Sequence, residues 1–101
     1  MKPRYITVQP FDLEVRILLT KKEWREHKVP KGAMAACMVR NEQYMLALPR
    51  KYDEPATWHE AHHLARWLNE AHGVLTDVDN HEADVYLMEH IVREVKRLYK
   101  E

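Results

Sequence analysis

Cysteine is nearly missing from this chain, because Cys37 is the only one among 101 residues. A lone cysteine cannot form an internal disulfide, which favours a reducing compartment such as the cytoplasm. Since Cys37 lies within the small apolar run 33–39, we expect it to be a buried core residue and not a reactive thiol.

Net charge and long apolar runs are lacking as well. Sixteen basic residues balance sixteen acidic ones, so no net electrostatic field draws the chain toward nucleic acid or an anionic membrane. No apolar run approaches the roughly 20 residues that a membrane span needs. Residues 1–10 are too short and too polar for a signal peptide. We therefore expect a cytoplasmic protein without nucleic-acid or membrane partners.

A length of 101 residues without an internal linker predicts one domain over residues 1–101. Alternating or β-favouring runs predict strands over 5–8, 13–19, 35–40 and 44–48, and the polar turn 41–43 makes an antiparallel hairpin of the last two. Helical periodicity and caps predict helices over 21–27, 57–72 and from 79 or 80 to about 99. The fold class is then α+β, with a small, mostly antiparallel sheet and two long C-terminal helices.

Histidine is abundant, with seven residues in the chain and four of them within 58–72. His59-Glu60-Ala61-His62-His63 contains the pattern His-Glu-x-x-His on a predicted helix. Residues four apart are about 40° apart around a helix and about 6 Å along it, so His59 and His63 can reach one metal ion. Two His and a third ligand leave a fourth zinc position for water, which is typical of a catalytic site.

Glu60 follows the first candidate ligand and can act as general base on a water whose pKa zinc lowers to about 7. A purely structural interpretation is also open. His59 and His63 fall on the polar side of the helical wheel, where they can simply be solvated, and Thr57-x-x-Glu60 is a legitimate capping box. His62 points elsewhere and is expected to be a surface or packing residue.

The downstream sequence bears on the third ligand. Glu82 lies nineteen residues after His63, and its stretch Glu-Ala-Asp-Val-Tyr resembles the Glu-Ala-Asn-x-Phe signature of small bacterial regulatory zincins. The whole of 57–90 resembles the gluzincin pattern and, more loosely, short proteins of tailed phages. The resemblance implies a minimal zincin-like core, zinc bound by Glu82 as third ligand, and an edge strand lining a substrate groove. The sequence departs from the gluzincin pattern in two ways. No Asn directly precedes Glu82, and no residue is assigned as transition-state stabiliser, a role for which Tyr86 and His90 are the candidates.

The final helix leaves the third ligand open. Glu82 lies away from its apolar face, on the side of Tyr86, so that polar side must turn toward the first long helix for Glu82 to reach the zinc. In the alternatives, Glu82 only helps to cap the helix and His81 is the ligand, or the protein supplies no third ligand. Asp84 lies within the apolar stripe, and we expect it to accept a hydrogen bond, for example from a zinc-binding histidine.

The sequence therefore predicts a zinc metallopeptidase in which Glu60 activates the water, with a peptide or protein as substrate. The rival hypothesis is a non-catalytic phage or bacterial accessory protein, whose His-rich face binds a structural metal or a partner.

Overall fold

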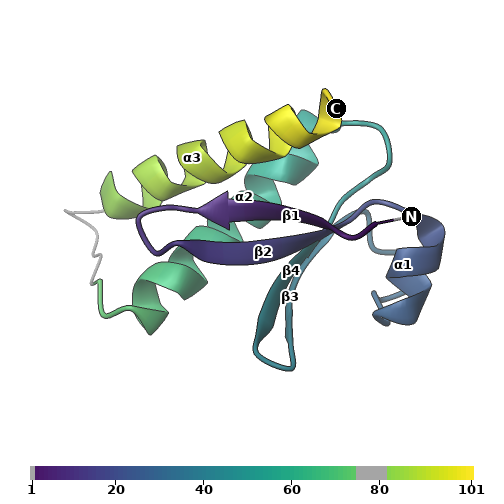
Figure 1. Cartoon of the computed structure of the whole chain (residues 1–101), viewed down its shortest axis with the longest axis horizontal. Coiled ribbons are helices and arrows are strands. Elements are labelled where there is room, and N and C mark those ends of the chain that lie inside the picture. The colour runs from purple at the N-terminus through teal and green to yellow at the C-terminus, as the bar shows by residue number, and fades with distance from the viewer. Residues whose placement is uncertain (1, 75–81) are drawn as a thin grey trace.

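The computed structural model describes residues 2–74 and 82–101. Its elements are strands β1 (Arg4–Val8) and β2 (Leu13–Leu18), helix α1 (Lys21–Glu26), strands β3 (Ala36–Arg40) and β4 (Gln43–Ala47), and helices α2 (Glu54–Ala71) and α3 (Glu82–Tyr99). Within this part of the chain the strands form one sheet in the order β1-β2-β4-β3 (Figure 1). The predicted α+β class with two long C-terminal helices is confirmed.

Two antiparallel hairpins build the sheet. β1 pairs with β2, β3 pairs with β4, and the two hairpins join through parallel pairing of β2 with β4. The turn between β3 and β4 is one residue shorter than expected, because Gln43 already pairs with Arg40. Asn41 and Glu42 both have positive φ, 51° and 64°, as the favoured two-residue hairpin turn requires.

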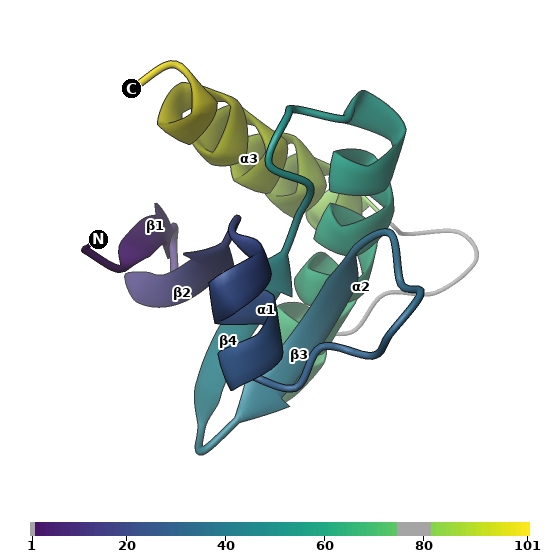
Figure 2. The same ribbon diagram turned by 90° about the vertical axis from the view of Figure 1, so that its right-hand side faces the viewer.

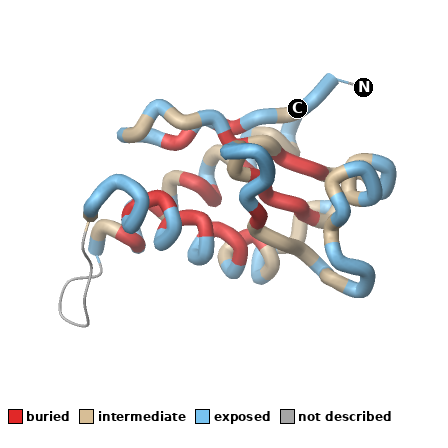
Figure 3. The backbone as a smooth tube through the Cα atoms, turned by 90° about the horizontal axis from the view of Figure 1, so that it is seen from below, coloured by how far each residue is buried: buried red, intermediate tan, exposed pale blue. Residues whose placement is uncertain are grey.

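The helices cover the two faces of the sheet unequally. One face carries the main core, in which strand residues such as Ile17 pack with Leu64 of α2 and Ile91 of α3. The other face has a smaller cluster around Met38 and Met45, against which Trp24 of α1 packs. Figure 2 shows α1 and α2 on opposite sides of the sheet, and Figure 3 shows the burial concentrated where the elements face one another.

Helix α2 begins earlier than the sequence predicted. Asp53 is its N-cap, with its carboxylate accepting a hydrogen bond from the backbone N–H of Ala56 at 2.9 Å. Thr57 lies buried inside the helix, and its hydroxyl donates to the Asp53 carbonyl at 2.8 Å. The prediction that Thr57 caps the helix was therefore wrong. Asp53 followed by Pro55 in the first turn is the stronger start signal.

The other predicted caps that lie within the described residues are confirmed. Thr20 and Glu23 form the capping box of α1, with both reciprocal hydrogen bonds present. Gly73 follows the C-cap His72 of α2 with a φ of 75°, the left-handed conformation that glycine adopts without strain. The predicted caps of the last helix at 79 and 80 lie outside the described residues.

Helices α2 and α3 run antiparallel. The amide of Asn69, near the end of α2, donates to Asp84 in the first turn of α3 at 2.7 Å. At the opposite ends, Lys96 of α3 forms an ion pair with Glu54 of α2 at 2.8 Å. None of the helices within 2–74 and 82–101 has the length and apolarity needed to cross a bilayer.

Candidate metal centre

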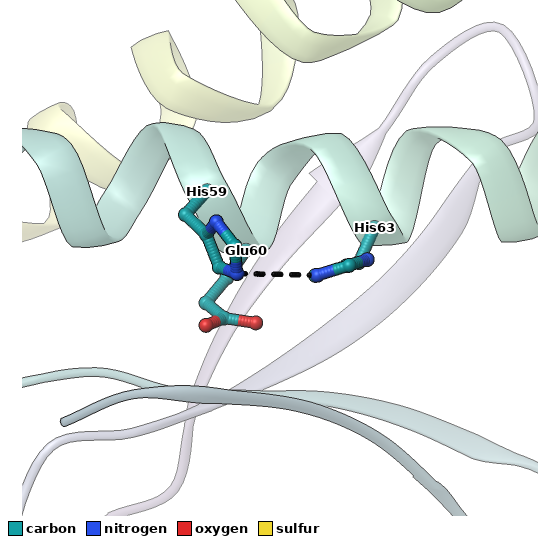
Figure 4. Close-up of side chains that lie close together, drawn as sticks. All are labelled: His59, Glu60 and His63. Carbon is teal, nitrogen blue, oxygen red and sulfur yellow. Dashed lines mark hydrogen bonds between the residues drawn. The ribbon is translucent and has the colours of Figure 1, made fainter. Parts of the chain in front are cut away.

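His59, Glu60 and His63 lie together on α2. Their potential ligand atoms are all within 4.8 Å of one another, and this group of three can hold a metal ion. The Nε2 atoms of His59 and His63 are 3.2 Å apart, as expected for side chains one helical turn apart (Figure 4). The two rings are nearly perpendicular, with 4.8 Å between their centroids.

The distance between the two imidazole nitrogens fits zinc. With Zn–N bonds of about 2.0–2.1 Å and tetrahedral angles, two nitrogen ligands of one zinc ion lie about 3.3 Å apart. The same 3.2 Å distance between His59 and His63 also suits one N–H···N hydrogen bond, so it permits metal binding without requiring it. Both histidines are exposed, so an ion can approach from solvent.

Glu60 differs from its two neighbours because it is buried, with only 6% of its surface exposed. Its carboxylate points from α2 toward the strands, whereas α3 passes on the other side of the helix in this view (Figure 4). Since α2 is capped by Asp53, the carboxylate of Glu60 is not used in a capping box, and that structural alternative was wrong. The carboxylate therefore lies beside the two imidazoles and is free of any role at the helix end.

Cys37 of β3 lies close enough to Glu60 for their charges to interact. Burial, and secondly the carboxylate of Glu60, raise the pKa of the Cys37 thiol to about 12. The side chain is partly buried and packs against the main core. A thiol with this pKa is protonated at neutral pH and is a poor nucleophile, as the sequence predicted.

A groove borders the group of three. It has a volume of about 600 Å³, and we call it the Met34 pocket; its lining residues are Met34, Ala35, Asp53, Pro55, Ala56, His59 and Glu60. Met34 and Ala35 lead directly into β3, the edge strand of the sheet in the described part of the chain. The candidate metal site is thus open toward a strand edge. Of these lining residues the sequence alone indicates only His59 and Glu60, because the packing of α2 against the segment that leads into β3 brings the others to the site.

Glu82 is not part of the group. It is exposed at the start of α3, where the Asn69–Asp84 hydrogen bond holds that helix against the end of α2. Asn69 lies six residues beyond His63, about 9 Å along the helix, and the antiparallel direction of α3 carries Glu82 farther still. The structure therefore does not bring Glu82 to His59 and His63. The alternative ligand His81 lies outside the described residues.

The remaining candidates also lie elsewhere. Asp84 is buried and accepts a hydrogen bond, as predicted, and Asn69 is a donor to it. Tyr86 is 67% exposed on α3. His90 accepts a hydrogen bond from the backbone N–H of Gln9 at 3.1 Å, next to the β1–β2 hairpin. His62 is exposed and does not belong to the group of three, as expected.

No protein-family model, curated protein or solved structure matches this chain. The function must therefore be inferred from the side chains and their geometry.

Proposed function

We propose that this protein is a zinc-dependent hydrolase that cleaves peptide bonds, with His59 and His63 binding the metal and Glu60 acting as general base. One observation supports the proposal above the others. Two imidazole nitrogens lie 3.2 Å apart, a spacing that suits one zinc ion, with a buried carboxylate in the same group of three. The groove beside them gives a substrate access.

Each residue of the group has a definable task. Zinc, when bound, polarises a carbonyl and lowers the pKa of water. The carboxylate of Glu60 takes a proton from the attacking water as the oxygen bonds to the carbonyl carbon. The same carboxylate then delivers that proton to the amine nitrogen as the C–N bond breaks. Burial of Glu60 restricts its rotamers and keeps it oriented for both transfers.

The edge strand β3 supports a peptide as substrate. In a two-residue hairpin the residues that flank the turn exchange both backbone hydrogen bonds, and the next pair does not. Counting back from Arg40, the backbone N–H and C=O groups of Cys37 and Val39 point away from β4. An extended peptide can use these groups to add to the sheet beside the group of three.

The third ligand remains a prediction. Glu82, which the resemblance to gluzincins favours, can reach the pair only if the start of α3 moves when metal binds. With α3 placed as it is, Glu82→Ala should change zinc affinity by less than about twofold. A loss of tenfold or more would instead show that this helix moves and supplies a ligand, because loss of even an outer-shell partner typically costs 10–100-fold.

Metal binding is tested by titrating zinc into protein purified without a His-tag. The wild type should bind about one zinc per chain, and His63→Ala should abolish stoichiometric binding, because one imidazole remains. His62→Ala is the matched control, since His62 is an exposed histidine of the same helix outside the group. Equal zinc content in all three proteins would contradict the site.

Catalysis is tested with Glu60→Gln, which keeps the size of the side chain but cannot act as a base. We expect zinc content and melting temperature to change little, while cleavage of unfolded proteins or peptide libraries falls by about 10²–10⁴-fold. Unchanged cleavage by Glu60→Gln protein would refute the mechanism.

The rival function is a non-catalytic metal-binding accessory protein of a phage or bacterium. The closeness of Glu60 to both imidazoles favours it, because the carboxylate can then serve as a third ligand. In that case Glu60→Gln should lower the zinc affinity, whereas a peptidase in which Glu60 is the general base should keep its zinc affinity in this variant. In either case the single cysteine predicts a cytoplasmic location.

A further inference from the structure

A second depression lies farther along the same helix and strand. It has a volume of about 400 Å³, and we call it the Trp67 pocket; it is lined by Val39, Tyr44, Trp67, Glu70 and Ala71. Both pockets take residues from α2; the Trp67 pocket adds residues of the β3–β4 hairpin, and the Met34 pocket adds the two residues that precede β3. Trp67 is 38% exposed and Val39 is 41% exposed, which is high for such apolar side chains.

The two pockets match the repeat of an extended chain. Ala35 of the Met34 pocket and Val39 of the Trp67 pocket are four residues apart, about 13 Å along a strand. On α2, His59 and Trp67 are eight residues apart, about 12 Å along a helix. Strand and helix therefore run beside each other over the same length, and His63 lies on α2 between the two pockets.

The backbone between the pockets is free to pair with a peptide. The carbonyl of Val39 is not engaged by β4, and its one hydrogen-bond donor among the described residues is the Arg40 guanidinium at 3.2 Å, a surface contact that a docking strand can replace. In an added strand, alternate residues face the same way, so side chains four positions apart meet the two pockets.

The pockets differ in chemistry. The Trp67 pocket is lined by two aromatic residues, Trp67 and Tyr44, which suit an aromatic or large aliphatic side chain. The charged residues that line either pocket, within the described chain, are all acidic. Glu70 is paired with Arg66 at 3.7 Å, whereas Asp53 has no ion pair with any described residue. The Met34 pocket therefore attracts a basic side chain, whose aliphatic stem can pack against Met34.

We propose that the substrate of the peptidase proposed above is an extended segment in which a large apolar residue is followed four positions later by Lys or Arg. The apolar side chain occupies the Trp67 pocket and the basic one approaches Asp53. This order follows if the peptide runs antiparallel to β3, the more stable pairing. The scissile bond then lies between the two anchor residues, opposite His63. The position of the scissile bond rests on the proposed function, whereas the sequence pattern of the substrate rests on the two pockets.

Binding is measured without cleavage, on zinc-loaded Glu60→Gln protein. The probe is a fluorescently labelled ten-residue peptide with blocked termini, which carries Phe and, four positions later, Lys. Three control peptides place the two residues three positions apart, reverse their order, or replace Phe by Ala. Each control should bind at least about tenfold more weakly, because it removes at least one side chain from its pocket. Equal affinity of all four peptides would overturn the inference.

Protein variants locate the contacts. In the Glu60→Gln background, Trp67→Ala should lower the affinity for the Phe peptide about tenfold. In this variant, replacing Phe by Ala in the peptide should cause no further loss of affinity. Tyr5→Ala, an exposed aromatic on β1, is the matched control and should have no effect. Asp53→Asn keeps a good helix cap and should weaken binding of the Phe–Lys peptide, but not of the same peptide with Lys replaced by Ala. If Trp67→Ala and Asp53→Asn bind like the parent protein, the assignment of the pockets is refuted.

The two proposals fail separately. Specific binding without any cleavage by the wild type would refute the peptidase and leave the recognition pattern standing. Cleavage that ignores both the Phe–Lys spacing and Trp67→Ala would leave the peptidase standing and refute the recognition pattern.

Discussion

Replacing Asn69 by alanine should lower the free energy of unfolding by about 2 kcal/mol. The amide of Asn69 donates to the carboxylate of Asp84 at 2.7 Å, and the two side chains are only 4% and 6% exposed. A hydrogen bond to a charged group is worth about 1.5–3 kcal/mol, and water has little access to replace the lost donor. For a chain of this length the melting temperature should fall by about 10 °C.

Thermal and urea unfolding of four proteins measure the effect: the wild type, Asn69→Ala, Asp84→Ala and the double variant. The double-mutant cycle isolates the coupling between the two side chains, which we expect to be at least 1 kcal/mol in magnitude, roughly one charged hydrogen bond. Glu70→Ala is the control on the same turn of α2. Its ion pair with Arg66 is exposed and should contribute less than about 0.5 kcal/mol. An Asn69→Ala protein as stable as the control would refute the reasoning.

The same variant also reports on the third ligand. If Glu82 reaches the metal through movement of α3, loss of the Asn69–Asp84 hydrogen bond removes a restraint on that movement. Asn69→Ala would then bind zinc more tightly while being less stable. If α3 stays in place, stability falls and zinc affinity does not change.

Three further predictions concern other parts of the molecule. Because the pKa of Cys37 is raised from 9.0 to about 12, the folded state keeps a proton that the unfolded state loses, so stability should fall between about pH 9 and pH 12. Cys37→Ala should show a shallower fall in melting temperature over the accessible part of that range; identical slopes would contradict the assignment. Asp53→Ala should cost about 1 kcal/mol of unfolding free energy and Asp53→Asn almost none, as measured in urea, because asparagine also caps helices well. A chelator should lower the melting temperature of the zinc-loaded wild type but not that of His63→Ala, since binding energy adds to folding energy only where zinc binds.

Local signals in the sequence sufficed for most of the fold. The hairpin of β3 and β4, the box of Thr20 and Glu23, and the end of α2 at Gly73 each depend on residues within a few positions. The start of α2 was misplaced because Thr57 and Asp53 are both good caps, and only Pro55 in the first turn distinguishes them.

The sequence predicted only the part of the candidate site that depends on residues close together in one helix. The approach of His59 to His63 follows from helical spacing, so the sequence contains it. The burial of Glu60 does not, because it depends on where β3 lies relative to α2, and that follows from the order of strands in the sheet. The position of Glu82 likewise depends on the pairing of Asn69 with Asp84, two residues that no sequence motif connects.

The hydrogen bond from Arg40 to the carbonyl of Val39 has a consequence for the protein at high concentration. An edge strand with free backbone groups can pair with the same strand of another copy and so begin an aggregate. A guanidinium that covers one of these carbonyls, and repels its counterpart on a second copy, opposes such pairing. Arg40→Ala should therefore leave the chain folded but make it self-associate at lower concentration. If a peptide pairs with β3 as we propose, Arg40 also competes with that peptide for the carbonyl of Val39.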